Sequence, residues 1–132
     1  MAALTGEDRE LLRGRNYAQL VTLNADGSPQ VTVLWVDADE DHVLLNTAEG
    51  RTKDLNLRRD PRGAVCVVED GDWYRWISIT GTVFDRVTGE EAERHIDALS
   101  RRYDDEPWNG VAGQVRVLYR IRPDRIIRYP RA

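Results

Sequence analysis

The chain has 132 residues, of which 41% are hydrophobic and 32% charged, a balance typical of a soluble globular protein and not of a disordered one. No apolar run approaches the roughly 20 residues that cross a bilayer, and the net charge of −4 disfavours nucleic acid as the main partner, because domains that follow phosphate backbones are usually strongly basic. We therefore expect a single domain over residues 1–132 that binds neither membrane nor nucleic acid.

The first predicted element is a helix near the start of the chain. Residues 1–8 lack a basic segment followed by an apolar stretch, so we expect no secretory signal and a cytoplasmic protein. Thr5 is placed to cap this helix, with Asp8 as its partner in a capping box, and Gly14 ends it.

Three strand-like runs follow, over residues 17–24, 30–37 and 42–47. Asp26-Gly27 between the first two is a hairpin signal, and the acidic residues 37–41 form the next turn. The run 30–37 is apolar at both alternating sets of positions, which predicts a strand covered on both faces.

A short helix is predicted over residues 51–60. It is expected to end there because Pro61 follows. Strands over 63–69 and 73–86 come next. A second full helix then follows, with Thr88 as its cap and Glu91 in a capping box. A loop over 104–113 leads to strands over 115–121 and 125–129. Six or seven strands, mostly joined as hairpins, with about three helices favour a mainly antiparallel barrel whose openings are covered by helices.

Lys53 is the only lysine of the chain and stands at the corner where a strand-like run gives way to a helix-like run. A compact ammonium beside the free N–H groups of a helix N-terminus suits a phosphate. A compositional accident is the alternative reading of this single feature.

The usual catalytic constellations are absent from the sequence. The single cysteine, Cys66, lies in an apolar strand-like run and is expected to be a small buried side chain. His42 and His95 have no metal-ligand spacing, so we expect no metal site. No catalytic residue stands out, which favours a protein that either binds a ligand or takes its chemistry from a cofactor.

Two stretches of the sequence resemble a known family: residues 26–30, Asp-Gly-Ser-Pro-Gln, and residues 50–62, Gly-Arg-Thr-Lys-Asp-Leu-Asn-Leu-Arg-Arg-Asp-Pro-Arg. They resemble the split β-barrel oxidoreductases of the pyridoxamine 5'-phosphate oxidase-like superfamily, above all the branch that uses the deazaflavin coenzyme F420. The resemblance runs from Leu11 to Ile127. It implies a mainly β (α+β) fold of the FMN-binding split-barrel type and a homodimer with its sites at the interface.

By matching position, the resemblance implies that Arg51 and Lys53 hold the cofactor phosphate. The other cofactor-binding residues that it implies are Thr52, Asn56, Asn46, Gln30, Val33 and Trp35. Many FMN-binding members carry a basic residue in the second strand; residues 30–36 contain none, which favours F420 over FMN. Trp73, Trp76 and Trp108 are candidates for the substrate pocket, with core or dimer packing as the alternative; the loop position of Trp108 makes it the best of them.

The implied function is that of an oxidoreductase that uses reduced coenzyme F420 to transfer hydride to an unsaturated or quinone-like organic substrate. An FMN-dependent oxidase or flavin reductase of the same fold is the first alternative. A non-catalytic protein that binds F420, flavin or haem is the second.

Overall fold

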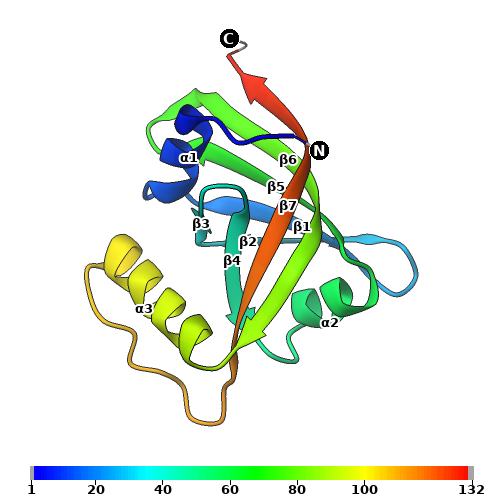
Figure 1. Ribbon diagram of the computed structural model, residues 1–132, viewed down its shortest axis with the longest axis vertical. Helices are drawn as coiled ribbons and strands as arrows, with labels where there is room; N and C mark the ends of the chain where they lie inside the picture. The colour runs from blue at the N-terminus through cyan, green and yellow to red at the C-terminus, as the bar shows by residue number, and fades with distance from the viewer. Residues whose placement is uncertain (1, 131–132) are drawn as a thin grey trace.

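Seven antiparallel strands form one curled sheet in the computed structural model, which describes residues 2–130 (Figure 1). The strands are β1 (Ala18–Leu23), β2 (Pro29–Leu34), β3 (Val36–Ala38), β4 (Val43–Ala48), β5 (Arg62–Glu69), β6 (Asp72–Thr88) and β7 (Arg116–Tyr129), and the helices are α1 (Gly6–Arg13), α2 (Thr52–Arg59) and α3 (Glu90–Asp104). The order across the sheet is β2-β1-β5-β6-β7-β4-β3. The predicted mainly β split barrel is confirmed.

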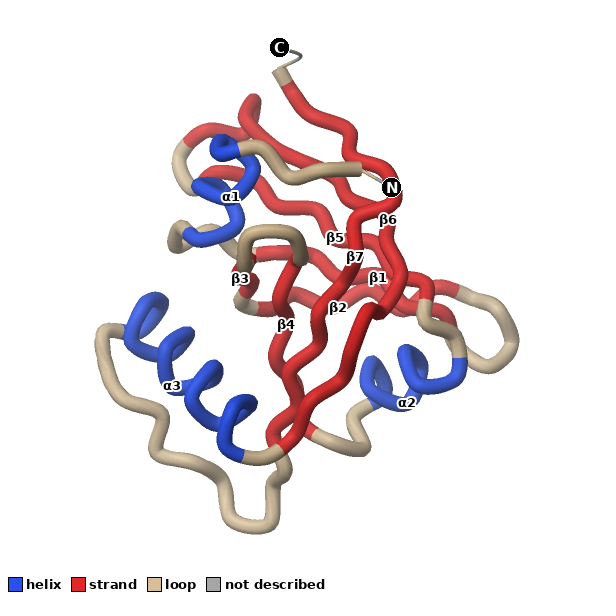
Figure 2. The backbone as a smooth tube through the Cα atoms, in the orientation of Figure 1, coloured by secondary structure: helices blue, strands red, loops and turns tan. Residues whose placement is uncertain are grey.

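The curl of the sheet encloses an apolar core, and α1 covers one end of it. Figure 2 shows α1 at one end of the curled sheet, with α2 and α3 towards the other end on opposite sides of β4. Leu11 and Leu12 of α1 belong to the core cluster. The predicted capping box is present, with Thr5 and Asp8 each accepting from the other's backbone N–H. Arg128 of β7 also donates to Asp8 at 2.7 Å, which ties α1 to the sheet.

The predicted strand over 30–37 is two strands in the structure. β2 pairs with β1 at one edge of the sheet and β3 pairs with β4 at the other, so the chain passes between the two edges at Trp35. The expectation that this run is covered on both faces is wrong within one chain. Val31 and Val33 are 60% and 63% exposed, because β2 is an edge strand whose outer face no other element of residues 2–130 covers.

Two further boundaries differ from prediction. The runs 115–121 and 125–129 form one strand, because β7 pairs continuously with the long β6 and absorbs Pro123 at a register shift. The expected cap of α3 is also wrong. Thr88 remains in β6, Gly89 with φ of 85° precedes the helix, and Glu91 forms an ion pair with Arg120 instead of closing a capping box.

Gly81 lies in β6 at a register shift, close against the backbone of β7. A Cβ at this position would lie 2.4 Å from the carbonyl oxygen of Arg122 and 2.7 Å from Cγ2 of Ile121. We expect Gly81→Ala to lower the free energy of unfolding by about 1–3 kcal/mol, measured by urea denaturation. Gly6→Ala is the matched control, because nothing lies within 4 Å of its added Cβ. Equal urea midpoints for Gly81→Ala and Gly6→Ala would show that β6 and β7 can move apart at Gly81 without loss of stability.

None of the helices within residues 2–130 combines the length and the apolar content that crossing a bilayer requires.

Candidate functional site

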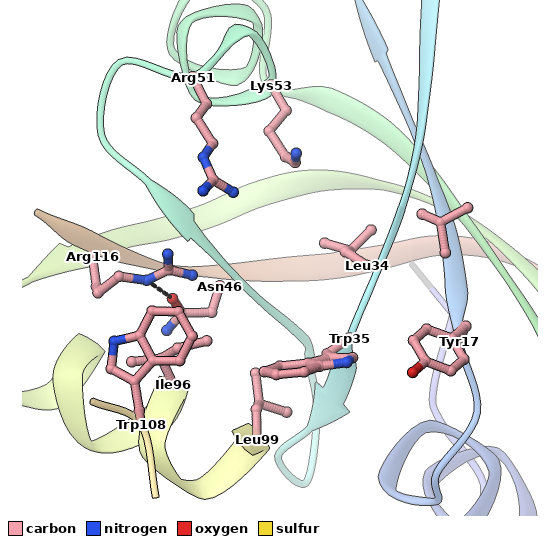
Figure 3. A pocket seen from close by; sticks show the side chains of 11 residues that line it. Tyr17, Leu34, Trp35, Asn46, Arg51, Lys53, Ile96, Leu99, Trp108 and Arg116 are labelled. Carbon is pink, nitrogen blue, oxygen red and sulfur yellow. Dashed lines mark hydrogen bonds between the residues drawn. The ribbon is translucent and has the colours of Figure 1, made fainter. Parts of the chain in front are cut away.

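A cavity of about 300 Å³ opens where the end of β2, the start of α2 and one face of α3 meet (Figure 3). Its wall divides into two chemical halves. One half is cationic and comes from the start of α2 and the start of β7. The other half is apolar and aromatic, and it comes from Trp35, from Tyr17 before β1 and from the buried face of α3.

Three cationic side chains face the first half of the cavity: Arg51, Lys53 and Arg116. Arg116 is only 5% exposed. Its Nε donates to Oδ1 of Asn46 at 3.0 Å, and its guanidinium carbon lies 5.1 Å from the centre of the Trp108 ring. Its Nη1 also donates to Oε1 of Gln114 at 3.0 Å, so Arg116 is held by two amides and an aromatic face rather than by a carboxylate.

The cations of this half repel one another. Burial and the nearby Arg51 lower the pKa of Arg116 to about 10. Burial, Arg51 and Arg116 likewise lower the pKa of Lys53. At neutral pH Arg116 still carries its charge, because its pKa stays well above 7. A bound anion would relieve this repulsion.

None of these cations forms an ion pair with a carboxylate of residues 2–130, whereas Arg86, Arg102 and Arg120 elsewhere in the fold each have one. Protein cations that are partly removed from water usually have a partner. Lys53 and Arg116 are such side chains, and together with the exposed Arg51 they form the arrangement expected of an anion-binding site.

The corner that carries Arg51 and Lys53 is fixed by a buried carboxylate. Gly50, with φ of 89°, turns the chain from β4 towards α2, and its N–H donates to Oδ2 of Asp54 at 3.0 Å. Asp54 is fully buried and also accepts from Arg86 Nε at 3.0 Å and from the Tyr119 hydroxyl. Burial alone would raise the pKa of Asp54, but the hydrogen bonds from Arg86, Tyr119 and Gly50 outweigh it and lower that pKa.

The apolar half of the cavity presents a flat aromatic wall. Trp35 stacks on Tyr103 with ring centres 5.3 Å apart and planes 8° apart, and Tyr17 lies 5.4 Å from Tyr103 at 51°. The Tyr103 hydroxyl donates to the carbonyl of Asn16 at 2.6 Å, which fixes the ring behind Trp35. Such a wall suits a planar conjugated ligand.

Six of the residues named from the sequence meet at this cavity: Arg51, Lys53, Asn46, Val33, Trp35 and Trp108. Three others do not border it. Asn56 donates from Nδ2 to Thr22 and to Asn24, at 3.0 Å each, and so fastens α2 to the β1 side of the sheet. Gln30 is the partner of the same Thr22 hydroxyl, and Thr52 is exposed in the first turn of α2.

Trp73 and Trp76 lie away from the cavity of their own chain. Trp73 is 83% exposed near the turn between β5 and β6. Trp76 stacks on Tyr129 with ring centres 5.8 Å apart. Within one chain, Trp108 is therefore the candidate that borders the cavity.

Sequence reasoning missed Arg116 and Asp54. Arg116 alternates with Val115 and Val117, a pattern typical of a solvent-facing position on a strand, and no local signal indicates that this face looks into a cavity. Asp54 in the first turn of a helix resembles an ordinary partner of the helix dipole. The sequence signal that could have identified Asp54 was its position directly after Lys53.

Other reactive groups offer little to this site. Within residues 2–130, no three His, Cys, Asp or Glu side chains are grouped so that they could hold a metal ion. Cys66 is half-buried in β5, and burial raises the pKa of its thiol.

Comparison with known proteins gives one family match and several similar structures. A family profile described as pyridoxamine 5'-phosphate oxidase matches residues 4–128. A solved structure named F420 Reductase is 27% identical, with a TM-score of 0.79, over 90% of this chain and 94% of that one. The conserved hypothetical protein Rv2991 from Mycobacterium tuberculosis is 22% identical, with a TM-score of 0.77, over 98% and 86%. HutZ, the heme storage protein from Vibrio cholerae, is 15% identical, with a TM-score of 0.65, over 97% and 96%. The last two likenesses concern the fold alone.

Proposed function

This chain belongs to the pyridoxamine 5'-phosphate oxidase family, and on that basis we propose that it is an oxidoreductase that uses reduced coenzyme F420 to reduce an unsaturated or quinone-like organic substrate. The observation that carries this proposal is the cavity itself. Three cations without carboxylate partners in residues 2–130 stand at one end of it and a flat aromatic wall at the other. A cofactor with an anionic tail and a planar ring matches both ends.

The cationic half fits a phosphate. Arg51 and Lys53 stand at the N-terminus of α2, where the backbone N–H groups of the first turn have no partner within the helix. Charge-assisted hydrogen bonds of this kind contribute about 1.5–3 kcal/mol each. Arg116 adds a third cation from β7. Together these groups anchor the tail and fix the depth at which the ring lies.

The aromatic half fits the ring. When bound, the deazaflavin supplies a hydride from its own ring carbon. Trp35, Leu34 and Leu99 then exclude water and orient the ring. The apolar character of this wall agrees with a reaction in which the chain positions two reactants and contributes no acid–base pair of its own.

Two observations support F420 over FMN. β2, Pro29–Leu34, carries no cation to add to phosphate binding, and the F420 reductase is similar to this chain along nearly the whole of both proteins. FMN is the second candidate cofactor, because the matching family is described as an oxidase. The activity would then be that of an oxidase or a flavin reductase.

We also propose that the working protein is a homodimer with its sites at the interface. Val33 borders the cavity and is nevertheless exposed, and its neighbour Val31 on the edge strand β2 is exposed too. A second copy packed on β2 would cover both valines and close the cavity on that side.

Parallel titrations of the apoprotein with F420, FMN and haem test the cofactor. Trp35 and Trp108 border the cavity, so intrinsic tryptophan fluorescence reports binding. We expect F420 to bind at least about tenfold more tightly than FMN, a difference of about 1.4 kcal/mol. Tighter binding of FMN would favour the flavin enzyme, and tight F420 binding without turnover of any enone or quinone would favour a carrier protein.

A further inference from the structure

A line of hydrogen-bonded side chains runs from the cavity into the protein behind Arg116. Arg116 Nε donates to Asn46 Oδ1 at 3.0 Å, and Asn46 Nδ2 lies 3.2 Å from His95 Nδ1. On its far side, His95 Nε2 lies 3.1 Å from Asp37 Oδ2. The side chains of His95 and Asp37 are 9% and 14% exposed, so this relay is screened from water.

The amide of Asn46 has a single favourable orientation. Its Nδ2 donates to the carbonyl of Ala92 at 3.0 Å while its Oδ1 accepts from Arg116. Turning the amide over would set oxygen against oxygen at Ala92 and N–H against N–H at Arg116. Asn46 is buried, and each buried group left without a partner costs about 1–3 kcal/mol. The second N–H of the amide therefore points at His95.

This orientation determines where His95 carries its proton. Because Asn46 donates to it, Nδ1 must accept and is unprotonated, so the proton is on Nε2 and is donated to Asp37. The other oxygen of Asp37 accepts from Arg102 at 3.0 Å. Burial would raise the pKa of Asp37, but the bond from His95 and the charge of Arg102 outweigh it, so Asp37 is ionised.

We propose that His95 is a positioning residue for anion binding: its unprotonated Nδ1 holds the Asn46 amide, and the amide aims Arg116 into the cavity. A proton on Nδ1 would oppose the N–H of Asn46. The imidazolium and the present hydrogen bond from Asn46 therefore exclude each other. Arg116 then keeps only its contacts with Gln114 and the Trp108 ring, so anion affinity falls on acidification. That the anion is a cofactor phosphate rests on the proposed function; the relay itself does not.

The other charged groups near the ring do not remove this conflict. Asp37 on β3 bonds the opposite nitrogen, and Arg102 on α3 is bound to Asp37. Glu91 on α3 is paired with Arg120 of β7. Each of these four groups is already in an ion pair, Asp37 with Arg102 and Glu91 with Arg120. None of these groups accepts a hydrogen bond from Nδ1, so a proton there has to displace the amide.

Two variants separate positioning from charge. His95→Asn places an amide oxygen where Nδ1 stands, accepts the same bond and does not titrate, whereas His95→Leu removes the acceptor at similar size. Sulfate is the first probe, because its charge is constant between pH 5.5 and 8, and F420 is the second. Tryptophan fluorescence gives both affinities.

We expect the wild-type sulfate affinity to fall about tenfold from pH 8 to pH 5.5, the equivalent of one hydrogen bond to a charged group. His95→Asn should keep the pH 8 affinity at both pH values, and His95→Leu should be about tenfold weaker at both. His42→Asn is the control for the other histidine, which bonds Asp39 instead, and should keep the wild-type slope. An unchanged affinity and slope in His95→Leu would overturn the proposal. Normal sulfate results without F420 binding would instead reject the proposed cofactor.

Nitrogen-15 NMR of the wild-type apoprotein gives a test that needs no variant to fold. At pH 8 we expect His95 to carry its proton on Nε2. On acidification, the Arg116 Nε–H and the Asn46 amide signals should move with the same midpoint as the protonation of Nδ1. A proton on Nδ1 at pH 8 would contradict the relay, and so would an Arg116 signal that does not change with pH.

Discussion

Lys53→Ala is expected to raise the Kd for coenzyme F420 by at least about tenfold in a calorimetric titration. The change removes one of three cations around the cavity and a charge-assisted contact worth about 1.5–3 kcal/mol, of which 1.4 kcal/mol is already tenfold. The Kd of Lys53→Arg should lie between those of the wild type and Lys53→Ala, because a planar guanidinium keeps the charge but not the compact point of contact. Removing Arg51 as well should weaken binding further.

Arg58→Ala is the matched control. It removes a cation from the same helix, but Arg58 is exposed and does not border the cavity. We expect it to leave the Kd within about twofold, since long-range charge effects at the surface are screened by salt. An unchanged Kd in Lys53→Ala, with a melting temperature equal to that of the wild type, would show that the phosphate lies elsewhere.

The second large effect concerns stability. Asp54→Ala is expected to lower the free energy of unfolding by about 3–5 kcal/mol, because it leaves Arg86, the Tyr119 hydroxyl and the Gly50 N–H without their buried partner. Urea denaturation measures the loss. Glu49→Ala is the control on the same arginine: Glu49 is half-exposed and pairs with Arg86 at 3.3 Å, so its removal should cost less than about 1 kcal/mol.

The effect of Asp54 should depend on pH in a defined direction. Its pKa in the folded protein lies below the ordinary 3.8, so its contribution to stability is present above that value and is lost as the pH falls further through the folded pKa. The difference in stability between wild type and Asp54→Ala should therefore be constant at neutral pH and shrink below about pH 4. A difference that grows towards acid would mean that Asp54 is not held as a carboxylate.

Local signals in the sequence predict much of the fold because they act within a few residues. The Thr5–Asp8 box, the Asp26-Gly27 hairpin and the stop at Pro61 were each confirmed in the structure. The break at Trp35 was not foreseeable in this way. It exists because Val36 finds its partner in β4 at the far edge of the sheet, a pairing that depends on the whole curl.

The residues of the candidate site divide in the same way, into those that a local sequence signal identifies and those that depend on distant parts of the chain. Arg51 and Lys53 stand out because their corner is a local feature, the junction of a strand and a helix. Arg116 reaches the cavity only because β7 pairs with β4, which brings it beside Asn46. The burial of Asp54 likewise depends on Arg86 and Tyr119, which lie 32 and 65 residues further along the chain.

Trp35 joins the two rims of the sheet and at the same time forms part of the cavity wall. A replacement there would disturb the passage of the chain between the two edges and the shape of the cavity together. Tyr17 and Trp108 border the same cavity from segments outside the strands. Substitutions at these two positions can therefore change the shape of the cavity while the pairing of the strands stays the same.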